Sequence, residues 1–138
     1  MYNPIFTQTI KSSFESVKAI LLGDESCGKT SIALFGLDTT LTKNFKINQN
    51  CINFVEKKIK LSSTEKKIVL NLWDLTSSFI DNSFLEHVIP YTNIIFFVYD
   101  LTNSTSFDNL KDWLKIVKDI DKKLKVTRQY VLLANKSN

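Results

Sequence analysis

A short segment near the start of the chain has the residue types and spacing of a phosphate-binding loop. Gly23 and Gly28 are separated by four residues, and Lys29 and Thr30 follow directly, which is the G-x-x-x-x-G-K-[ST] (Walker A) pattern. Backbone N–H groups must converge on a phosphate in such a loop, and glycine allows that close approach. Lys29 would add a positive charge, and the Thr30 hydroxyl could bind Mg²⁺. The predicted phosphate site comprises Gly23, Asp24, Glu25, Ser26, Cys27, Gly28, Lys29, Thr30 and Ser31.

A second candidate, Asp74, follows the apolar segment 69–73. Ligands of open α/β sheets bind outside the carboxyl ends of the strands, so we expect Asp74 to face the Mg²⁺ held by Thr30, directly or through water. The predicted metal ligands are therefore Thr30 and Asp74. We assign no catalytic residue, and His87, the one histidine, has no partner pattern for catalysis or metal binding.

The strands that must position these residues are indicated by runs of apolar side chains. Residues 17–22 form such a run, which ends at Gly23 and fits a buried strand. Residues 62–65 form a polar turn between two alternating segments and indicate a hairpin. We expect strands at residues 17–22, 52–61, 66–73, 94–99 and 130–134.

Helical patterns alternate with these strands. Residues 29–35 and 79–88 are expected to form short helices, the second closed by Pro90. Asn103 or Ser104 can cap a longer helix, whose apolar residues recur every three or four positions at Phe107, Leu110, Leu114, Val117 and Ile120. This alternation predicts an α/β fold: a mostly parallel sheet with one antiparallel hairpin strand and helices on both faces.

The composition limits the classes of partner. The 138 residues carry 18 basic and 14 acidic side chains, a net charge of +4. The basic residues are spread out and include a single arginine, Arg128, whereas nucleic-acid surfaces usually cluster arginine with exposed aromatics, so we expect no nucleic-acid partner. Cys27 and Cys51 indicate neither a disulfide framework nor a zinc site, and reduced thiols are expected.

Signals for export, membrane insertion and lipidation are not recognisable. Residues 1–15 lack the charged-then-apolar pattern of a secretory signal, and the apolar run 94–99 is too short to span a bilayer. Tyr2 does not fit myristoylation, and Ser137-Asn138 offers no prenylation cysteine. We expect a cytoplasmic protein, with no transmembrane segment and no lipidation site, that associates with a membrane only through a partner.

Several motifs together resemble the Ras superfamily of small GTPases, and the Rab type most closely. The phosphate loop at residues 23–31 is similar to the first motif of that family, and Leu72-Trp73-Asp74 resembles the strand that opens its second switch. Residues 98–103, followed by residues 106–110 and Trp113, are similar to the fourth strand and third helix of Rabs. The resemblance covers about residues 15–138.

This resemblance implies a G domain of the phosphate-loop NTPase class, with GTP and GDP as ligands, Mg²⁺ as cofactor, and a switch that binds effectors when GTP is bound. Asn135-Lys136 resembles the start of the guanine-recognition motif, so Asn135, Lys136 and Asn138 become the candidate base-binding residues. Protein effectors and regulators would bind residues 52–73 and the second switch. Phe54 and Trp73 could belong to that face or to plain packing.

The first switch departs from the family pattern. The family has a threonine there that closes over Mg²⁺ and the γ-phosphate. That position falls on Asn48 when counted from the phosphate loop and on Gln49 when counted from the following strand. Neither residue supplies the hydroxyl, although either amide could lend an oxygen to the metal.

The second switch departs as well, since it reads Asp74-Leu75-Thr76-Ser77-Ser78 where the family has Asp, two residues, Gly and Gln. Ser77 replaces the glycine whose N–H approaches the γ-phosphate. Ser78 replaces the glutamine that orients the attacking water, and its side chain is too short for that role. Because GTPases depend on positioning and charge stabilisation, we predict intrinsic hydrolysis slower by roughly two or more decades.

Base recognition is altered at Asn138, where the family has an aspartate that accepts from the guanine N1–H and N2–H₂. An amide offers one acceptor and one mismatched donor, so about 1–3 kcal/mol of guanine preference should be lost. Bases with an acceptor at C2, such as xanthine, would be favoured. If Asn138 is the terminus, its α-carboxylate could substitute.

We predict an N-terminal extension at residues 1–15 and a truncated G domain at residues 16–138 that lacks the last strand and helix of the family fold. One sheet edge and one sheet face would then be bare, so either the gene product is truncated or another chain covers the gap. Three functions remain open. They are a GTP/GDP-binding Rab-like switch in vesicle traffic or signalling with weak or absent hydrolysis, a pseudo-GTPase that serves as a nucleotide-independent interaction module, and an ATP-using phosphate-loop enzyme.

Overall fold

The computed structural model describes residues 14–35, 53–63, 65–75 and 80–137. Within these residues, strands and helices alternate as the apolar pattern predicts. The elements are β1 (Phe14–Leu22), α1 (Lys29–Leu34), β2 (Asn53–Lys60), β3 (Lys67–Asp74), α3 (Asn82–Val88), β4 (Ile94–Asp100), α4 (Ser104–Leu124) and β5 (Gln129–Asn135).

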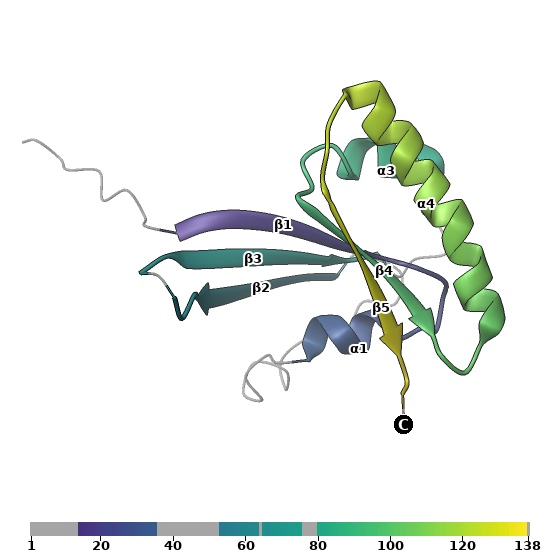
Figure 1. Ribbon diagram of the computed structural model, residues 1–138, viewed down its shortest axis with the longest axis horizontal. Helices are drawn as coiled ribbons and strands as arrows, with labels where there is room; N and C mark the ends of the chain where they lie inside the picture. The colour runs from purple at the N-terminus through teal and green to yellow at the C-terminus, as the bar shows by residue number, and fades with distance from the viewer. Residues whose placement is uncertain (1–13, 36–52, 64, 76–79, 138) are drawn as a thin grey trace, which may run out of the picture.

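The five strands form one sheet in the order β2-β3-β1-β4-β5 (Figure 1). β1 lies at the centre and pairs in parallel with β3 on one side and β4 on the other. β4 and β5 are also parallel, and β2 and β3 form the one antiparallel pair of the described strands. The predicted mixed α/β sheet with a single hairpin is therefore confirmed.

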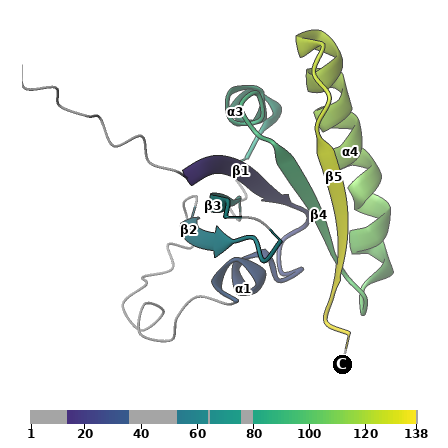
Figure 2. The ribbon, with the colours of Figure 1, turned by 60° about the vertical axis from the view of Figure 1, so that its left-hand side comes forward.

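Helices cover both faces of this sheet, also as predicted (Figure 2). α1 lies against one face, and α3 and α4 lie against the other. Alternate residues of β1 serve the two faces, because neighbouring side chains of a strand point in opposite directions. On the α3–α4 face, the buried cluster contains Ile20, Leu22, Leu75, Leu85, Val88, Ile89, Ile95, Phe97, Leu110, Val117 and Ile120. On the α1 face, it contains Leu21, Cys27, Ala33, Val55 and Val98.

Capping side chains mark the starts of α3 and α4. The Asn103 side chain accepts a hydrogen bond from the Thr105 N–H at 3.1 Å and so begins α4, as expected. Asp81 caps α3 by accepting from the Phe84 N–H at 2.8 Å, so this helix begins three residues later than the sequence pattern suggested. None of the described helices is long and apolar enough to cross a membrane.

A closed polar network joins the amino end of β5 to its neighbours. The Arg128 guanidinium pairs with the Asp121 carboxylate of α4 at 2.5 Å, and both side chains are buried. Arg128 also donates to the carbonyl oxygens of Ile89 at 2.6 Å and Thr92 at 2.7 Å. The Tyr130 hydroxyl donates to Asp121 as well. The network therefore ties α4, β5 and the α3–β4 connection together.

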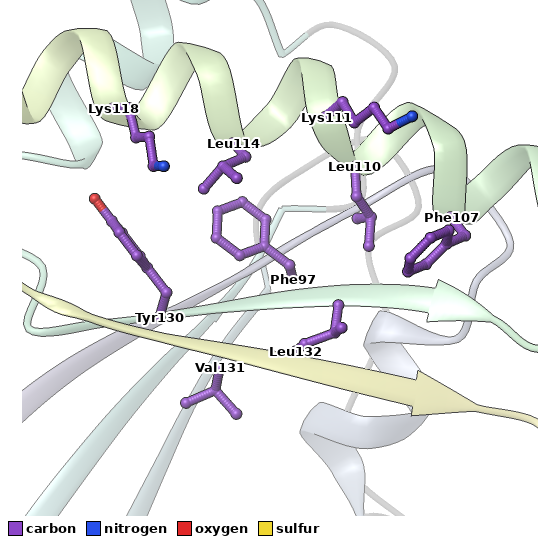
Figure 3. Close-up of a pocket in the computed structure, with 9 residues that line it drawn as sticks. All are labelled: Phe97, Phe107, Leu110, Lys111, Leu114, Lys118, Tyr130, Val131 and Leu132. Carbon is purple, nitrogen blue, oxygen red and sulfur yellow. The ribbon is translucent and has the colours of Figure 1, made fainter.

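An apolar groove of about 370 Å³ lies between α4 and β5, the outermost strand on that side of the described sheet. Figure 3 shows Phe97, Leu110 and Leu114 between the helix and the strands. Leu132 is 56% exposed at the edge of this groove. Phe107 belongs to the predicted apolar stripe of α4 but is 46% exposed, because it lies in the helix's first turn and packs against Tyr99 rather than deeper in the core.

Candidate functional site

The segment from Gly23 to Lys29 leaves the carboxyl end of β1 in a conformation that depends on its two glycines. Gly23 has a φ of 152°, and a Cβ there would lie 2.2 Å from the Val98 carbonyl oxygen. Gly28 has a φ of 94°, and a Cβ there would lie 2.0 Å from Asn135 Nδ2. The backbone angle disfavours other residues at both positions, and at Gly23 the obstacle is also main chain, whereas at Gly28 it is the end of a side chain.

Lys29 is 3% exposed, and its ammonium group lies inside this loop. It donates to the carbonyl oxygens of Gly23 at 2.8 Å and Asp24 at 2.6 Å. These acceptors carry no net charge, so the ammonium makes no direct hydrogen bond to an anionic group among the described residues. A buried ammonium in such surroundings favours an anion beside it.

Thr30 and Asp74 meet at the carboxyl ends of β1 and β3. The Thr30 hydroxyl donates to Asp74 Oδ2 at 2.6 Å, and the Asn53 amide donates to the same oxygen at 3.3 Å. Asp74 is fully buried, and its Oδ1 atom has no hydrogen-bond partner among the described residues. Burial raises the pKa of this carboxyl group, while hydrogen bonds from Thr30 and Asn53 and the positive charge of Lys29 lower it.

This arrangement fits a magnesium ion. A buried carboxylate oxygen without a partner is costly, and a hard cation would satisfy it. A hydroxyl and a carboxylate are ligands that Mg²⁺ accepts, and the ion usually completes its shell with waters and phosphate oxygens. The described residues contain no group of three or more His, Cys, Asp and Glu side chains suited to a metal.

Two of the candidate base-binding residues, Asn135 and Lys136, contact the phosphate loop from the carboxyl end of β5. The Asn135 amide donates to the Cys27 carbonyl oxygen at 2.9 Å. Lys136 donates to the Ser26 carbonyl oxygen at 2.7 Å and to the Asp100 carboxylate at 2.7 Å. Hydrogen bonds from Lys136 and Thr102 lower the pKa of Asp100 to about 2. The two motifs, more than a hundred residues apart, thus form one continuous site.

Comparison with known proteins agrees with this geometry. A family model described as "Roc: Ras of Complex, Roc, domain of DAPkinase" matches residues 18–138, which is most of the chain and includes both motifs. The chain belongs to this family of Ras-like GTPase domains. Its curated relatives make it Rab-like, as the sequence motifs predicted.

Three relatives illustrate this similarity. The chain is 31% identical to the Ras-related protein Rab-28 of Caenorhabditis elegans over 122 residues, 88% of this chain and 48% of the relative. It is 31% identical to the Ras-related protein RabV of Dictyostelium discoideum, over 71% of this chain and 41% of the relative. It is 30% identical to an intraflagellar transport protein 27 homolog of Bos taurus, over 72% of this chain and 54% of the relative. The chain thus spans about half the length of these relatives.

The structure of this Rab-like domain brings together most of the predicted site. Of the phosphate loop, Cys27 and Lys29 are buried, and burial raises the pKa of the Cys27 thiol. Glu25, Ser26 and Ser31 are exposed. Some predicted positions lie outside the described residues, namely the switch residues Asn48, Gln49, Thr76, Ser77 and Ser78, the base candidate Asn138 and Cys51.

The sequence analysis did not identify four residues that contact the predicted site residues. Asn53 and Asp100 bind Asp74 and Lys136, as described above. Asn109 and Trp113 of α4 both donate to the Asp24 carboxylate, at 2.6 Å and 3.3 Å. The sequence could have indicated Asp100, because this residue follows an apolar run at the end of a strand, as Asp74 does. Trp113 packs against the core, and its indole N–H also contacts the phosphate loop.

The candidate effector face carries two aromatic side chains on neighbouring strands. The rings of Phe54 and Trp73 lie 6.0 Å apart, nearly perpendicular, and Phe54 is 46% exposed. Behind them, the Lys18 ammonium lies 4.3 Å from the centre of the Trp73 ring and donates to the Val88 carbonyl oxygen at 2.8 Å. Burial lowers the pKa of Lys18. Trp73 is thereby held in place, while Phe54 is available to a partner.

Proposed function

We propose that residues 16–138 form a G domain that binds GTP and GDP as a Rab-like molecular switch. The observation that best supports this is the buried Lys29 ammonium, which is hydrogen-bonded to two neutral carbonyl oxygens inside the phosphate loop. A nucleotide phosphate is the anion that this loop pattern accommodates. Asn135 and Lys136, which contact the same loop, provide the neighbouring place for a base.

In this proposal Lys29 contacts the β- and γ-phosphates, and main-chain N–H groups of residues 23–31 supply the remaining donors. Thr30 and Asp74 would hold Mg²⁺, which neutralises charge on the phosphate oxygens. Asn135, Lys136 and Asn138 would bind the base. Because Asn138 replaces an aspartate, we expect a reduced preference for guanine, which competition by GDP, xanthosine diphosphate and ADP would measure.

We infer that hydrolysis by this chain alone is weak or absent. Ser78 stands where a glutamine orients water in the family, and its side chain is too short for that role. Single-turnover measurement of phosphate release from bound GTP tests this. A rate comparable with that of a GTPase that has the glutamine would contradict it.

The cellular role that we propose is vesicle traffic or signalling, through effectors that bind residues 52–73 and the second switch. The exposed Phe54 beside Trp73 supports this face, and the Rab and intraflagellar transport names of the relatives support the role. We propose a cytoplasmic location, with membrane association only through a partner protein.

The decisive experiment is the nucleotide content of the purified protein. Denaturing the protein and separating the released compounds by chromatography should yield GDP or GTP, and stripped protein should rebind them in the presence of Mg²⁺. A folded sample that holds no purine nucleotide would overturn the proposal. ATP retained in preference to GTP would instead indicate an ATP-using phosphate-loop enzyme.

A second candidate is a pseudo-GTPase that acts as a nucleotide-independent interaction module. It is favoured by the replacements at Asn48 or Gln49, Ser77 and Ser78, which change three positions on which nucleotide sensing and hydrolysis depend in the family. The two functions differ in their response to Lys29→Ala. If partner binding survives this substitution unchanged, the interaction module is the correct function.

A further inference from the structure

The second residue of the phosphate loop, Asp24, carries a negative charge next to the place proposed for anionic phosphates. Its main-chain carbonyl oxygen accepts from the Lys29 ammonium at 2.6 Å, so the backbone of this residue is part of the phosphate cradle. A carboxylate free to turn toward bound phosphates would repel them, and the repulsion is strong in partly buried surroundings. The direction of this one side chain therefore matters for nucleotide affinity.

Both oxygens of the Asp24 carboxylate are held by α4. Oδ2 accepts from the Asn109 amide at 2.6 Å, and Oδ1 accepts from the Trp113 indole N–H at 3.3 Å. These donors are four residues apart, one turn of the helix, so they project from the same side of α4. They lie 85 and 89 residues beyond Asp24 in the sequence, and no local turn could supply these contacts.

The helix that carries the two donors is itself well anchored. α4 is 21 residues long, is capped by Asn103 at its start and ends at Lys125 in a left-handed conformation. Trp113 packs against the buried cluster of the α3–α4 face. Fixed donors lose little conformational entropy on binding, so they hold the carboxylate more firmly than mobile surface side chains would.

We infer that Asn109 and Trp113 are positioning residues for nucleotide binding: they hold the Asp24 carboxylate against α4 and so keep its charge away from the phosphates. This inference rests on the proposed nucleotide-binding function. It assigns α4 a second task besides covering the sheet. It also explains how an acidic residue is tolerated in the middle of an anion-binding loop.

The test measures the affinity of stripped protein for GDP with Mg²⁺ in four single variants and one double variant. Asn109→Ala should weaken binding roughly tenfold, the lower end of what a hydrogen bond to a charged group contributes at a partly exposed position. Trp113→Phe, which removes only the N–H, should weaken it about threefold, because its contact is longer. The matched control is Asp108→Ala, an exposed neighbour on α4, which should leave the affinity unchanged.

The fourth variant separates positioning from a merely structural role. Asp24→Asn removes the charge and keeps the shape, so adding Asn109→Ala to it should change the affinity less than about twofold. The loss caused by Asn109→Ala alone should also shrink at high salt, because screening weakens the repulsion by the released carboxylate. An equal loss in both backgrounds, or a loss independent of salt, would overturn the inference.

The outcome distinguishes this inference from the proposed function. If wild-type protein binds GDP and both Asn109→Ala and Trp113→Phe bind it equally well, the inference fails while the function stands. If Asn109→Ala does not fold, Trp113→Phe takes its place. The loss of affinity that it causes alone is then compared with the loss that it causes in the Asp24→Asn background. If folded wild-type protein binds no nucleotide at all, the function and the inference fall together.

Discussion

Two basic residues with buried side chains lie at opposite ends of the sheet. Both donate hydrogen bonds to main-chain carbonyl oxygens, but their roles differ. Lys29, beyond the carboxyl end of β1, donates to the carbonyl oxygens of Gly23 and Asp24. Arg128, at the amino end of β5, donates to the carbonyl oxygens of Ile89 and Thr92. Arg128 has in addition a buried carboxylate partner, whereas the acceptors of Lys29 are neutral.

The difference shows how a structural network is distinguished from a binding site in this domain. The planar guanidinium of Arg128 satisfies several fixed acceptors at once, and Asp121 balances its charge. The ammonium of Lys29 is a compact charge on a flexible stem, which can exchange a carbonyl oxygen for a phosphate oxygen. The charge of Arg128 is balanced by a hydrogen-bonded carboxylate, whereas the Lys29 ammonium, whose acceptors are neutral, gains from an added anion. Each of the following predictions tests this contrast.

Arg128→Ala should produce the largest effect, a decrease in the free energy of unfolding. It leaves the Asp121 carboxylate buried without its partner, and breaking such a pair costs about 3–5 kcal/mol. Urea unfolding of the nucleotide-free protein measures this loss. The control is Lys123→Ala, which breaks an exposed ion pair with Glu86 and should cost at most about 1 kcal/mol. Equal costs for the two variants would show that the buried network is not structural.

Lys29→Ala should reduce nucleotide affinity strongly and stability only a little. Affinity for GDP should fall by at least about 100-fold, because a charged hydrogen-bond donor to the phosphates is lost. The free energy of unfolding without nucleotide should fall by less than in Arg128→Ala. Isothermal titration and urea unfolding of both variants give the comparison. If Lys29→Ala proves the more destabilising of the two, Lys29 is a structural residue and the contrast is wrong.

Gly28→Ala should have an intermediate effect on the stability of the loop. A left-handed backbone costs a residue with a Cβ about 1–2 kcal/mol, and the added carbon would collide with the Asn135 side chain. Adding Asn135→Ala should restore part of the loss, because the obstacle is the far end of that side chain. No such rescue should exist for Gly23→Ala, where the obstacle is the Val98 backbone. Urea unfolding of the single and double variants checks both statements.

The smallest effect concerns the pH dependence of the structural network. Burial, together with the hydrogen bond to Asp121, raises the pKa of Tyr130 to about 12, from an ordinary value of 10.0. The folded state therefore favours the neutral phenol. Its contribution is fully present below pH 10 and is lost as the pH rises from about 10 to about 12.

This loss can be measured by comparing wild-type protein with Tyr130→Phe. Between pH 9 and about 12, the urea midpoint of the wild-type protein should fall more steeply than that of the variant, because lysine titration is common to both. Parallel curves would mean that Tyr130 does not titrate with folding. The binding of GDP to folded protein should not respond to Tyr130→Phe, because this hydroxyl lies in the Arg128 network.

The sequence predicted the fold well because its apolar pattern is regular. The runs at β1 and β4 and the alternation in β3 match strands that pair in parallel or antiparallel as expected. Differences appeared at element ends, where capping decides: α3 begins after Asp81 because that side chain accepts the Phe84 N–H. A sequence pattern marks an element more reliably than its first residue.

The site was less predictable where it depends on contacts between distant elements. The loop pattern identified Lys29 and Thr30 because their spacing is local. The contacts of Asp24 with Asn109 and Trp113 required knowing how α4 lies over the loop, which no local pattern encodes. Asp100 could have been proposed by the rule that identified Asp74, since both end strands that flank β1.

The central place of β1 has a consequence for how the polypeptide reaches its native state. This strand precedes its neighbours in the sequence, yet Phe14 pairs with Lys67, and Ala19 pairs with Ile94. Contacts so distant along the chain form slowly, because large loops must close before they contribute, whereas the β2–β3 hairpin can form within microseconds. The central strand of the sheet is thus the one whose partners are made last. During synthesis on the ribosome, the apolar residues of β1 would stay exposed until β3 has emerged. This strand would therefore be the preferred binding segment for a chaperone.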